Sequence, residues 1–441
     1  MPEGTELRRS LGWFDASSVV IGIVVGAGIF VTPQDLAKAM PSAEGMIGVW
    51  LLSGFLVFCG SLAFAELSTA FPRTGGLYVY LKEAFGEEAA FSCGWVHLLA
   101  LLSGATAYIA AGFGRYLSFI LPLDEGQQRW VAVLLILVLS SLNAYSTRAT
   151  IGFQNLAGLA KLAALLILIG AAFLAPSPTA PQPLPQNAGA GSLAVALAVC
   201  FFCYEGWSYV GFVAGEVKEP SKNLPKVFAV SFLLVVALYL LVNLAYLRVF
   251  NISELQNSSQ IGAELARRAL GPFGAYLVTA TILIAIVGSV NGICLAASRL
   301  YFAQSKDGLF LPTLEKLHPK RGTPARAIAL HAAISCLLLW VSSLGNILQA
   351  AIFSAWLYYF ATIAGLMWMR RSRPELSRPY KMWGYPITPI LFLVGTGNFL
   401  FSLLMQNPYP PAAVLLLIGL SVPVARQLRK SSRARSAPEL A

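Results

Sequence analysis

The chain has 441 residues, of which 57% are hydrophobic and only 12% are charged. A soluble domain carries about 25% charged residues, so this chain has too few of them to cover a surface that faces water. The composition excludes an ordinary soluble protein and indicates that most of the surface contacts lipid. The net charge of +11 would suit a nucleic-acid-binding protein, but the positions of the basic residues indicate membrane topology instead.

Apolar runs of about 20 residues recur about twelve times along the chain, and this is the length that a helix needs to cross a bilayer. We therefore predict an all-α polytopic membrane protein. The predicted order is a cytoplasmic N-terminus at 1–12, five helices over 13–175, a Pro-rich link at 176–191, five helices over 192–370, two helices over 387–427 and a basic cytoplasmic tail at 428–441.

The basic residues predict the orientation of these helices. An even number of spans places both termini on one side, and placing them in the cytoplasm puts most of the 31 Lys and Arg residues there as well. Cytoplasmic loops of membrane proteins carry such an excess of positive charge. We expect a multi-pass protein of the cell (inner) membrane with both termini cytoplasmic and the Pro-rich link outside.

Five spans before the link and five after it place the two halves in opposite orientations. The first span contains VVGAGIF, and the sixth, which is the first after the link, contains CFFCYEGWSYVGF. Transporters built from inverted repeats have broken helices at such corresponding positions. We therefore predict a 5+5 inverted repeat in which helices 1 and 6 are broken.

A broken helix exposes N–H groups on one half and C=O groups on the other, and these ends carry partial positive and negative charge. A zwitterionic amino acid suits such a site, with its carboxylate on the N–H groups and its ammonium on the carbonyls. Gly26 and Gly28 would let a ligand approach the backbone closely. The breaks therefore predict a site for an amino acid.

Four ionisable residues within or near the spans are candidates for function. Lys161 could brace the broken backbone of the first span, or extend toward the inner headgroups; we favour the first. Glu205 could line the substrate site, or be an inert carboxylate bonded to nearby backbone. Glu66 could form a gating salt bridge with a basic loop residue or simply lie at the interface, and we favour the second. Arg299 could contact the inner gate or the headgroups.

No arrangement of residues predicts an enzyme. Cys200 and Cys203 form a CxxC pair, but no second pair or nearby histidine completes a metal site. No P-loop, nucleophile–base pair or pair of carboxylates stands out. We expect no catalysis, no metal and no cofactor.

Four motifs resemble those of the amino acid–polyamine–organocation (APC) superfamily. They are GAGIF in the first span, AELSTAFPRTGGLYVYLKEAFG from Ala65, FFCYEGWSYVGFVAGEVKEPSKNLPK in and after the sixth span, and SRLYFAQSKDGLFLP from Ser298. The chain is most similar to the L-type amino acid transporter branch and to bacterial serine/threonine and alanine/serine/cysteine exchangers. The resemblance covers nearly the whole chain and implies a leucine-transporter-type fold.

The resemblance also implies roles for particular residues. The N–H groups of the motif would bind the substrate carboxylate, and carbonyls at both breaks would bind its ammonium. Phe202 would be the outer gate. From the residues alone, Phe202 and Trp207 could be lids over a bound substrate or ordinary packing residues. Lys161 would stand in for the cation of sodium-coupled relatives, which implies sodium independence. The implied substrate-binding residues are Val24, Gly26, Ala27, Gly28, Phe202, Cys203 and Glu205.

Two departures from the family pattern bear on function. Glu205 stands where relatives carry Gly or Asp, and carriers with an acid there transport either cationic or neutral amino acids. The outer loop LPLDEGQQ lacks the cysteine with which animal relatives join a heavy subunit. We expect a stand-alone, monomeric, sodium-independent exchanger of small or medium neutral L-amino acids. The alternatives are a proton-coupled permease, possibly for cationic amino acids, and a membrane sensor that binds amino acids without transporting them.

Overall fold

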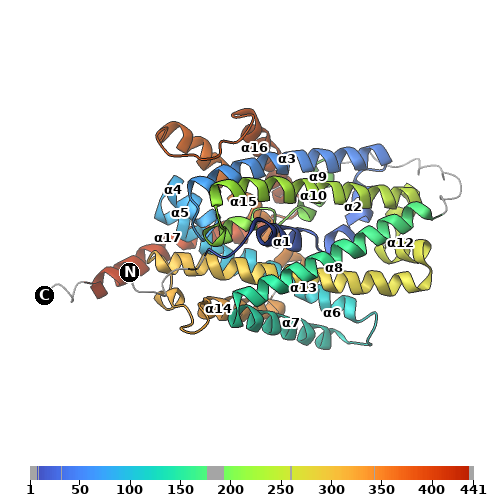
Figure 1. Ribbon diagram of the computed structural model, residues 1–441, viewed down its shortest axis with the longest axis horizontal. Coiled ribbons are helices and arrows are strands. Elements are labelled where there is room, and N and C mark those ends of the chain that lie inside the picture. Colours follow the sequence, from blue (N-terminus) through green and yellow to red (C-terminus); the bar gives the residue numbers. More distant parts are fainter. Residues whose placement is uncertain are drawn as a thin grey trace.

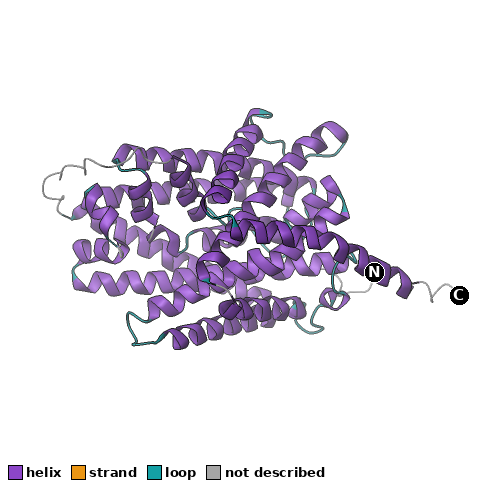
Figure 2. Cartoon of the chain, turned by 180° about the vertical axis from the view of Figure 1, so that it is seen from behind, coloured by secondary structure: helices purple, strands orange, loops and turns teal. Residues whose placement is uncertain are grey.

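The computed structural model describes residues 7, 9–30, 32–175, 193–258, 261–341 and 343–436. Within these ranges the regular structure is helical, and the only β-pairing is one isolated bridge between Leu11 and Val217 (Figure 2). The predicted all-α class is confirmed. The predicted link at 176–191 and the last five residues of the predicted tail lie outside the described residues.

The elements that precede the link include one 3-10 helix, η1, and one π-helix, η2. In chain order they are α1 (Trp13–Val24), η1 (Ala27–Phe30), α2 (Thr32–Ala39), α3 (Ala43–Ala70), α4 (Leu77–Phe85), α5 (Glu87–Val96), η2 (His97–Leu101), α6 (Leu102–Leu117), α7 (Glu125–Tyr145) and α8 (Thr147–Leu174).

The elements that follow the link include two further 3-10 helices, η3 and η4. They are α9 (Leu193–Cys203), η3 (Tyr209–Glu216), α10 (Pro220–Val249), α11 (Ile252–Asn257), α12 (Ile261–Leu270), α13 (Pro272–Lys306), η4 (Pro312–Glu315), α14 (Ala325–Val341), α15 (Leu344–Ser372), α16 (Ile387–Gln406) and α17 (Tyr409–Ser436).

In the described part of the chain, nine helices are long and apolar enough to cross a membrane, and three shorter ones are apolar. Two of the short helices, α1 and α9, are the spans that the sequence predicts to be broken. Figure 1 shows the long helices lying side by side, and the C-terminal part of α17 lies at one end of the bundle, which we call the terminal end. The other is the far end.

Local chemistry explains where several helices begin. The hydroxyls of Ser42, Ser146 and Ser343 accept hydrogen bonds from backbone N–H groups in the first turns of α3, α8 and α15. Such caps satisfy N–H groups that have no partner within the helix. Pro220 and Pro272 begin α10 and α13, where the missing N–H of proline costs nothing.

A buried carboxylate fastens the terminal ends of α3 and α15. Glu66 has no exposed surface, and it accepts hydrogen bonds from Arg370 and from the backbone N–H of Met382 at 2.8 Å. The guanidinium of Arg378 lies 3.4 Å from the same carboxylate. The expectation of simple interfacial placement is therefore wrong, because Glu66 joins two helices and the loop at 373–386.

We expect Glu66→Ala to lower the free energy of unfolding by about 3–5 kcal/mol, since removing one partner of a buried ion pair leaves the other charge uncompensated. The melting temperature in detergent, followed by size-exclusion chromatography after heating, measures this loss. Glu375→Ala, at an exposed carboxylate of the same loop, should leave the melting temperature unchanged. Equal melting temperatures for the two variants would contradict this role of Glu66.

At the far end, α11 packs against α2, which belongs to the first broken span. The side chain of Gln34 donates to the carbonyl of Gln256 at 3.2 Å, and that of Gln256 donates to the carbonyl of Ala37 at 3.0 Å. Arg268 on α12 pairs with Glu254 on α11 and with Glu264 on its own helix. These contacts fix α11 and α12 against each other, and α11 against α2.

This far-end charge cluster predicts a pH dependence. Hydrogen bonds from Arg268 lower the pKa of Glu254 below its ordinary 4.5, and hydrogen bonds from Arg267 and Arg268 lower the pKa of Glu264. Carboxylates with lowered pKa values stabilise the fold above that ordinary value, and the stabilisation disappears as the pH falls through the lowered pKa. Because solvent screens these exposed pairs, the effect is small.

We expect hydrogen-exchange protection of α12, corrected for intrinsic rates, to fall a few-fold on acidification below the ordinary carboxyl pKa. Glu264→Gln should reduce this pH dependence because it removes one titrating group. Protection that stays constant or rises on acidification would contradict the ion-pair account.

Candidate functional site

The first interruption lies between α1 and η1. Helix α1 ends at Val24, and the chain turns at Val25 and Gly26, where the N–H of Gly26 donates to the carbonyl of Val24 at 2.7 Å. The 3-10 helix η1 then begins at Ala27. The N–H groups of Ala27 and Gly28 are thus at the start of a helix, where they have no partner within it.

Side chains from other helices bind the carbonyls at the end of α1. Lys161 on α8 is fully buried, and its Nζ donates to the carbonyls of Gly22 at 2.6 Å and Val25 at 2.9 Å. Ser289 on α13 donates to the carbonyl of Ile23 at 3.1 Å. Since carbonyls at a helix end need outside partners, these contacts stabilise the break. Lys161 thus lies inside the bundle, as favoured, and does not reach headgroups.

The second interruption follows α9. Helix α9 ends at Cys203, and the chain makes turns through Tyr204 to Ser208 before η3 begins at Tyr209. Gly206 has φ +107°, a backbone conformation that side chains with a Cβ rarely adopt. This backbone conformation favours glycine at position 206. Just before it, the N–H of Glu205 donates to the carbonyl of Phe202 at 3.2 Å.

The two interruptions touch each other. The hydroxyl of Tyr239 on α10 lies 2.6 Å from the carbonyl of Val24 and 3.1 Å from that of Cys203, so one side chain bridges both breaks. A Cβ placed on Gly28 would lie 3.3 Å from the Sγ of Cys203 and 3.5 Å from the ring of Phe202. The absence of a side chain at Gly28 thus permits this close approach.

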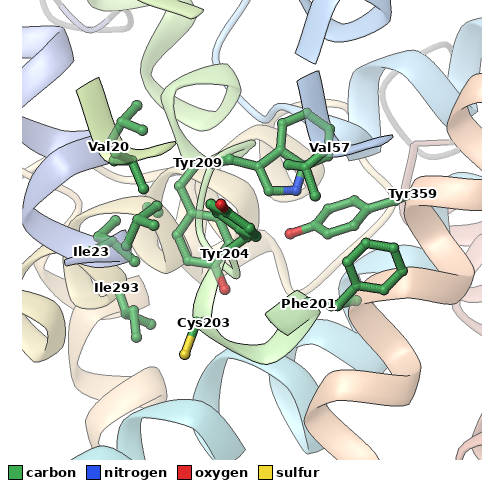
Figure 3. Close-up of a cluster of buried hydrophobic side chains, with 14 of the residues drawn as sticks. Val20, Ile23, Val57, Phe201, Cys203, Tyr204, Tyr209, Ile293 and Tyr359 are labelled. Atoms are coloured by element: carbon green, nitrogen blue, oxygen red, sulfur yellow. The ribbon is translucent and has the colours of Figure 1, made fainter. Parts of the chain in front are cut away.

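Figure 3 shows buried side chains of both breaks gathered in one cluster, with Val20 and Ile23 from the first and Cys203, Tyr204 and Tyr209 from the second. Sequence reasoning missed Tyr239 and Ser289. Both are common polar residues within apolar runs, and nothing in the sequence places them beside the breaks.

Glu205 has one bound and one unbound carboxylate oxygen. Its Oε1 accepts a hydrogen bond from the hydroxyl of Tyr359 on α15 at 2.6 Å, and that hydroxyl accepts one from Ser208 at 3.0 Å. Its Oε2 is buried and has no hydrogen-bond partner among the described residues. A buried oxygen without a partner is costly, so this one is available to a donor that enters the site.

Phe202 and Trp207 occupy different surroundings. Phe202 is partly buried and its ring lies beside Gly28, at the first break. Trp207 is 1% exposed, and its ring packs 4.7 Å from that of Phe64 and 5.1 Å from that of Tyr359. Phe202 is thus placed where it could cover a ligand, whereas Trp207 is a packing residue in this conformation.

Gly26 and Ala27, the remaining predicted residues of the first break, contribute their backbone to the site. Gly26 faces Ser289, since a Cβ there would lie 3.4 Å from its Oγ. Ala27 contributes its backbone at the start of η1. The predicted substrate residues therefore come from two segments, 24–28 and 202–205, that lie against each other. In the described part of the chain, no three His, Cys, Asp or Glu residues form a group that could hold a metal ion.

Comparisons with known proteins show the family to which the chain belongs. The family model described as amino acid permease matches residues 11–421. The chain is 30% identical to the human b(0,+)-type amino acid transporter 1, over 95% of this chain and 88% of that one. It is 30% identical to the human cystine/glutamate transporter, over 86% and 77% of the two chains.

A third human relative, the large neutral amino acids transporter small subunit 2, is 29% identical over 96% of this chain and 80% of its own. These relatives are transporters and not enzymes, as expected for this chain. The name of the third relative describes it as a subunit of a larger assembly. It therefore gives no support to the expected stand-alone monomer. With a family model matched over most of its length, this chain is a multi-pass membrane protein of the amino acid permease family, within the APC superfamily.

Proposed function

We propose that the chain is a sodium-independent exchanger of small or medium neutral L-amino acids that works by alternating access. The observation that supports this most is the contact of Lys161 with the carbonyls of Gly22 and Val25. By the family resemblance, a fixed basic group there replaces the cation of sodium-coupled carriers. The transport cycle would then need no sodium.

The substrate zwitterion would lie across the two breaks. Its carboxylate would bind the N–H groups of Ala27 and Gly28, because the N-terminus of a helix attracts anions. Its ammonium would bind carbonyls of Val24, Phe202, Cys203 and Glu205. Two of these carbonyls already lie near the hydroxyl of Tyr239, but a carbonyl oxygen has two lone pairs and a hydroxyl has one proton. The hydroxyl can donate to only one of the two carbonyls at a time, and the carbonyl of Val24 also accepts the N–H of Gly26, so a lone pair for the ammonium remains on the carbonyl to which Tyr239 does not donate.

The gate would be Phe202, whose ring lies beside Gly28. Movement of this ring would open the breaks to one side of the membrane. Trp207 would act as a second gate only if the cycle releases it from Phe64 and Tyr359. In the proposed topology the terminal end is cytoplasmic and the membrane is the inner membrane. The proposed carrier works without a disulfide-linked partner, since the loop at 121–128 contains no cysteine.

A second candidate function is transport of cationic amino acids, which the unpartnered Oε2 of Glu205 favours. A guanidinium or ammonium on the substrate side chain would supply the missing donor. In a proton-coupled version, a proton taken up by Glu205 would neutralise the carboxylate instead. Stimulation by internal amino acids and the effect of Glu205→Gln distinguish exchange of neutral amino acids from transport of cationic ones.

The test uses purified protein in sodium-free liposomes. We expect uptake of labelled alanine into liposomes loaded with alanine, serine or leucine to exceed uptake into empty ones at least tenfold. If internal arginine stimulates uptake more than these neutral amino acids, and Glu205→Gln abolishes that stimulation, the second candidate is correct. Accumulation in empty liposomes under a pH gradient would indicate a proton-coupled permease. Saturable binding without flux would indicate a sensor.

A further inference from the structure

The N-terminal segment is joined to the second broken span at the terminal end of the bundle. Leu11, which precedes α1, forms a parallel β-bridge with Val217, which follows η3. The N–H of Leu11 donates to the carbonyl of Glu216 at 2.9 Å, and the N–H of Lys218 donates to the carbonyl of Leu11 at 2.9 Å. Leu11 and Val217 are both buried. We call residues 11 and 216–218 the strap.

The strap connects the terminal-end halves of the two interrupted spans, α1 and η3. Its two hydrogen bonds join backbone to backbone, so they do not depend on side chains that could rotate away. Each half is separated from the rest of its own span by a break, at Val25–Gly26 and at Tyr204–Ser208. Each segment is thus separated from the rest of its span by a break, and the two segments are bonded to each other at the terminal end of the bundle. They can therefore move together.

Among the contacts that hold this unit to its surroundings, one lies at the strap itself. Glu216, inside the strap, forms a buried ion pair with Arg299 on α13, with 2.9 Å between Oε1 and Nε. Arg299 also donates to Thr147 on α8 at 3.1 Å. Because Arg299 is fully buried, the expectation of a headgroup contact is wrong. This pair joins the strap to α13, a helix without a break.

We propose that the strap makes α1 and η3 move as one unit during transport, and that the Glu216–Arg299 pair is the latch that this unit must leave when the site opens at the terminal end. The strap stays closed because two backbone hydrogen bonds and the buried side chains of Leu11 and Val217 hold it together, and the proposed motion does not require them to part. The latch can open because the water that enters the site there solvates both charges, whereas a dry interior would penalise their separation.

The strap is tested by covalent closure. Residues opposed in a β-bridge lie within reach of a disulfide, whose Cα atoms are about 4.4–6.8 Å apart. We expect oxidised Leu11→Cys/Val217→Cys protein to exchange alanine at no less than half the rate of the same protein after reduction. A large loss of exchange on oxidation, restored by reduction, would show that the halves separate and would overturn the proposal.

The latch is tested by a cross-link that prevents the pair from separating and should therefore lower exchange. In Glu216→Cys/Arg299→Cys protein, bridging with a flexible bis-methanethiosulfonate reagent should lower exchange at least tenfold relative to the unbridged protein. An unchanged rate would overturn the latch. If either pair fails to fold, exposed Ser10→Cys/Lys218→Cys, bridged by the same reagent, replaces the strap pair, and Thr147→Cys/Glu216→Cys replaces the latch pair.

The inference rests on the proposed exchange, and the two failures are distinguishable. If the unmodified chain exchanges no amino acid in liposomes, the proposed function is wrong. If it exchanges amino acids and closure of the strap stops exchange, only the strap is wrong. Each ratio compares one protein before and after cross-linking, so a purely structural effect of the substitutions does not change it.

Discussion

Lys161→Ala should lower alanine exchange in liposomes at least tenfold. The substitution leaves the carbonyls of Gly22 and Val25 without the donor that now lies at 2.6 and 2.9 Å. Each buried acceptor that loses its partner costs about 1–3 kcal/mol, and a tenfold change in rate corresponds to about 1.4 kcal/mol. The end of α1 would therefore shift, and the site with it.

The matched control is Lys38→Ala, which removes the same charge from an exposed position on α2, in the far-end part of the same span. We expect it to exchange alanine at the rate of the unmodified chain. Equal rates for Lys161→Ala and the unmodified chain would contradict the role assigned to Lys161, whatever the control does.

Gly206→Ala should destabilise the protein by about 2–6 kcal/mol and lower exchange in proportion to the misfolded fraction. Alanine at φ +107° is strained by about 1–3 kcal/mol. Its Cβ would also lie 2.5 Å from Cγ2 of Ile23, and overpacking of this kind costs about 1–3 kcal/mol. Ile23 belongs to the first break, so the substitution would force the two breaks apart.

Gly152→Ala is the control for this prediction. Gly152 lies on an exposed face of α8, and a Cβ there would meet no atom within 4 Å. We expect an unchanged or slightly raised melting temperature, since alanine favours helix more than glycine does. A melting temperature for Gly206→Ala equal to that of Gly152→Ala would show that the left-handed backbone at Gly206 is not required.

Much of the fold could be predicted because lipid imposes strict requirements on sequence. A spanning helix needs about 20 apolar residues, so the spans appear as runs in the chain. The breaks could also be predicted, since Gly26, Gly28 and Gly206 interrupt such runs. The position of Lys161 follows from the cost of a basic group in lipid. The 5+5 inverted repeat and the cytoplasmic position of the termini remain predictions.

The rest depends on contacts between residues far apart in sequence, which no local pattern encodes. Tyr239 bridges both breaks, yet it resembles any other tyrosine in a membrane helix. Glu66 was correctly singled out as an acid near a span end, but its partners Arg370 and Arg378 lie some 300 residues away. The bridge at Leu11 is made by backbone alone and leaves no trace in side-chain pattern.

The central claim is that bare peptide groups at two breaks recognise both charges of an amino acid, and competition in the liposome assay tests it most directly. L-Alaninamide lacks the carboxylate, and L-lactate lacks the ammonium. We expect neither to reduce uptake of labelled alanine at concentrations where serine abolishes it. Competition by either analogue as strong as that by serine would contradict binding of the zwitterion across the two breaks.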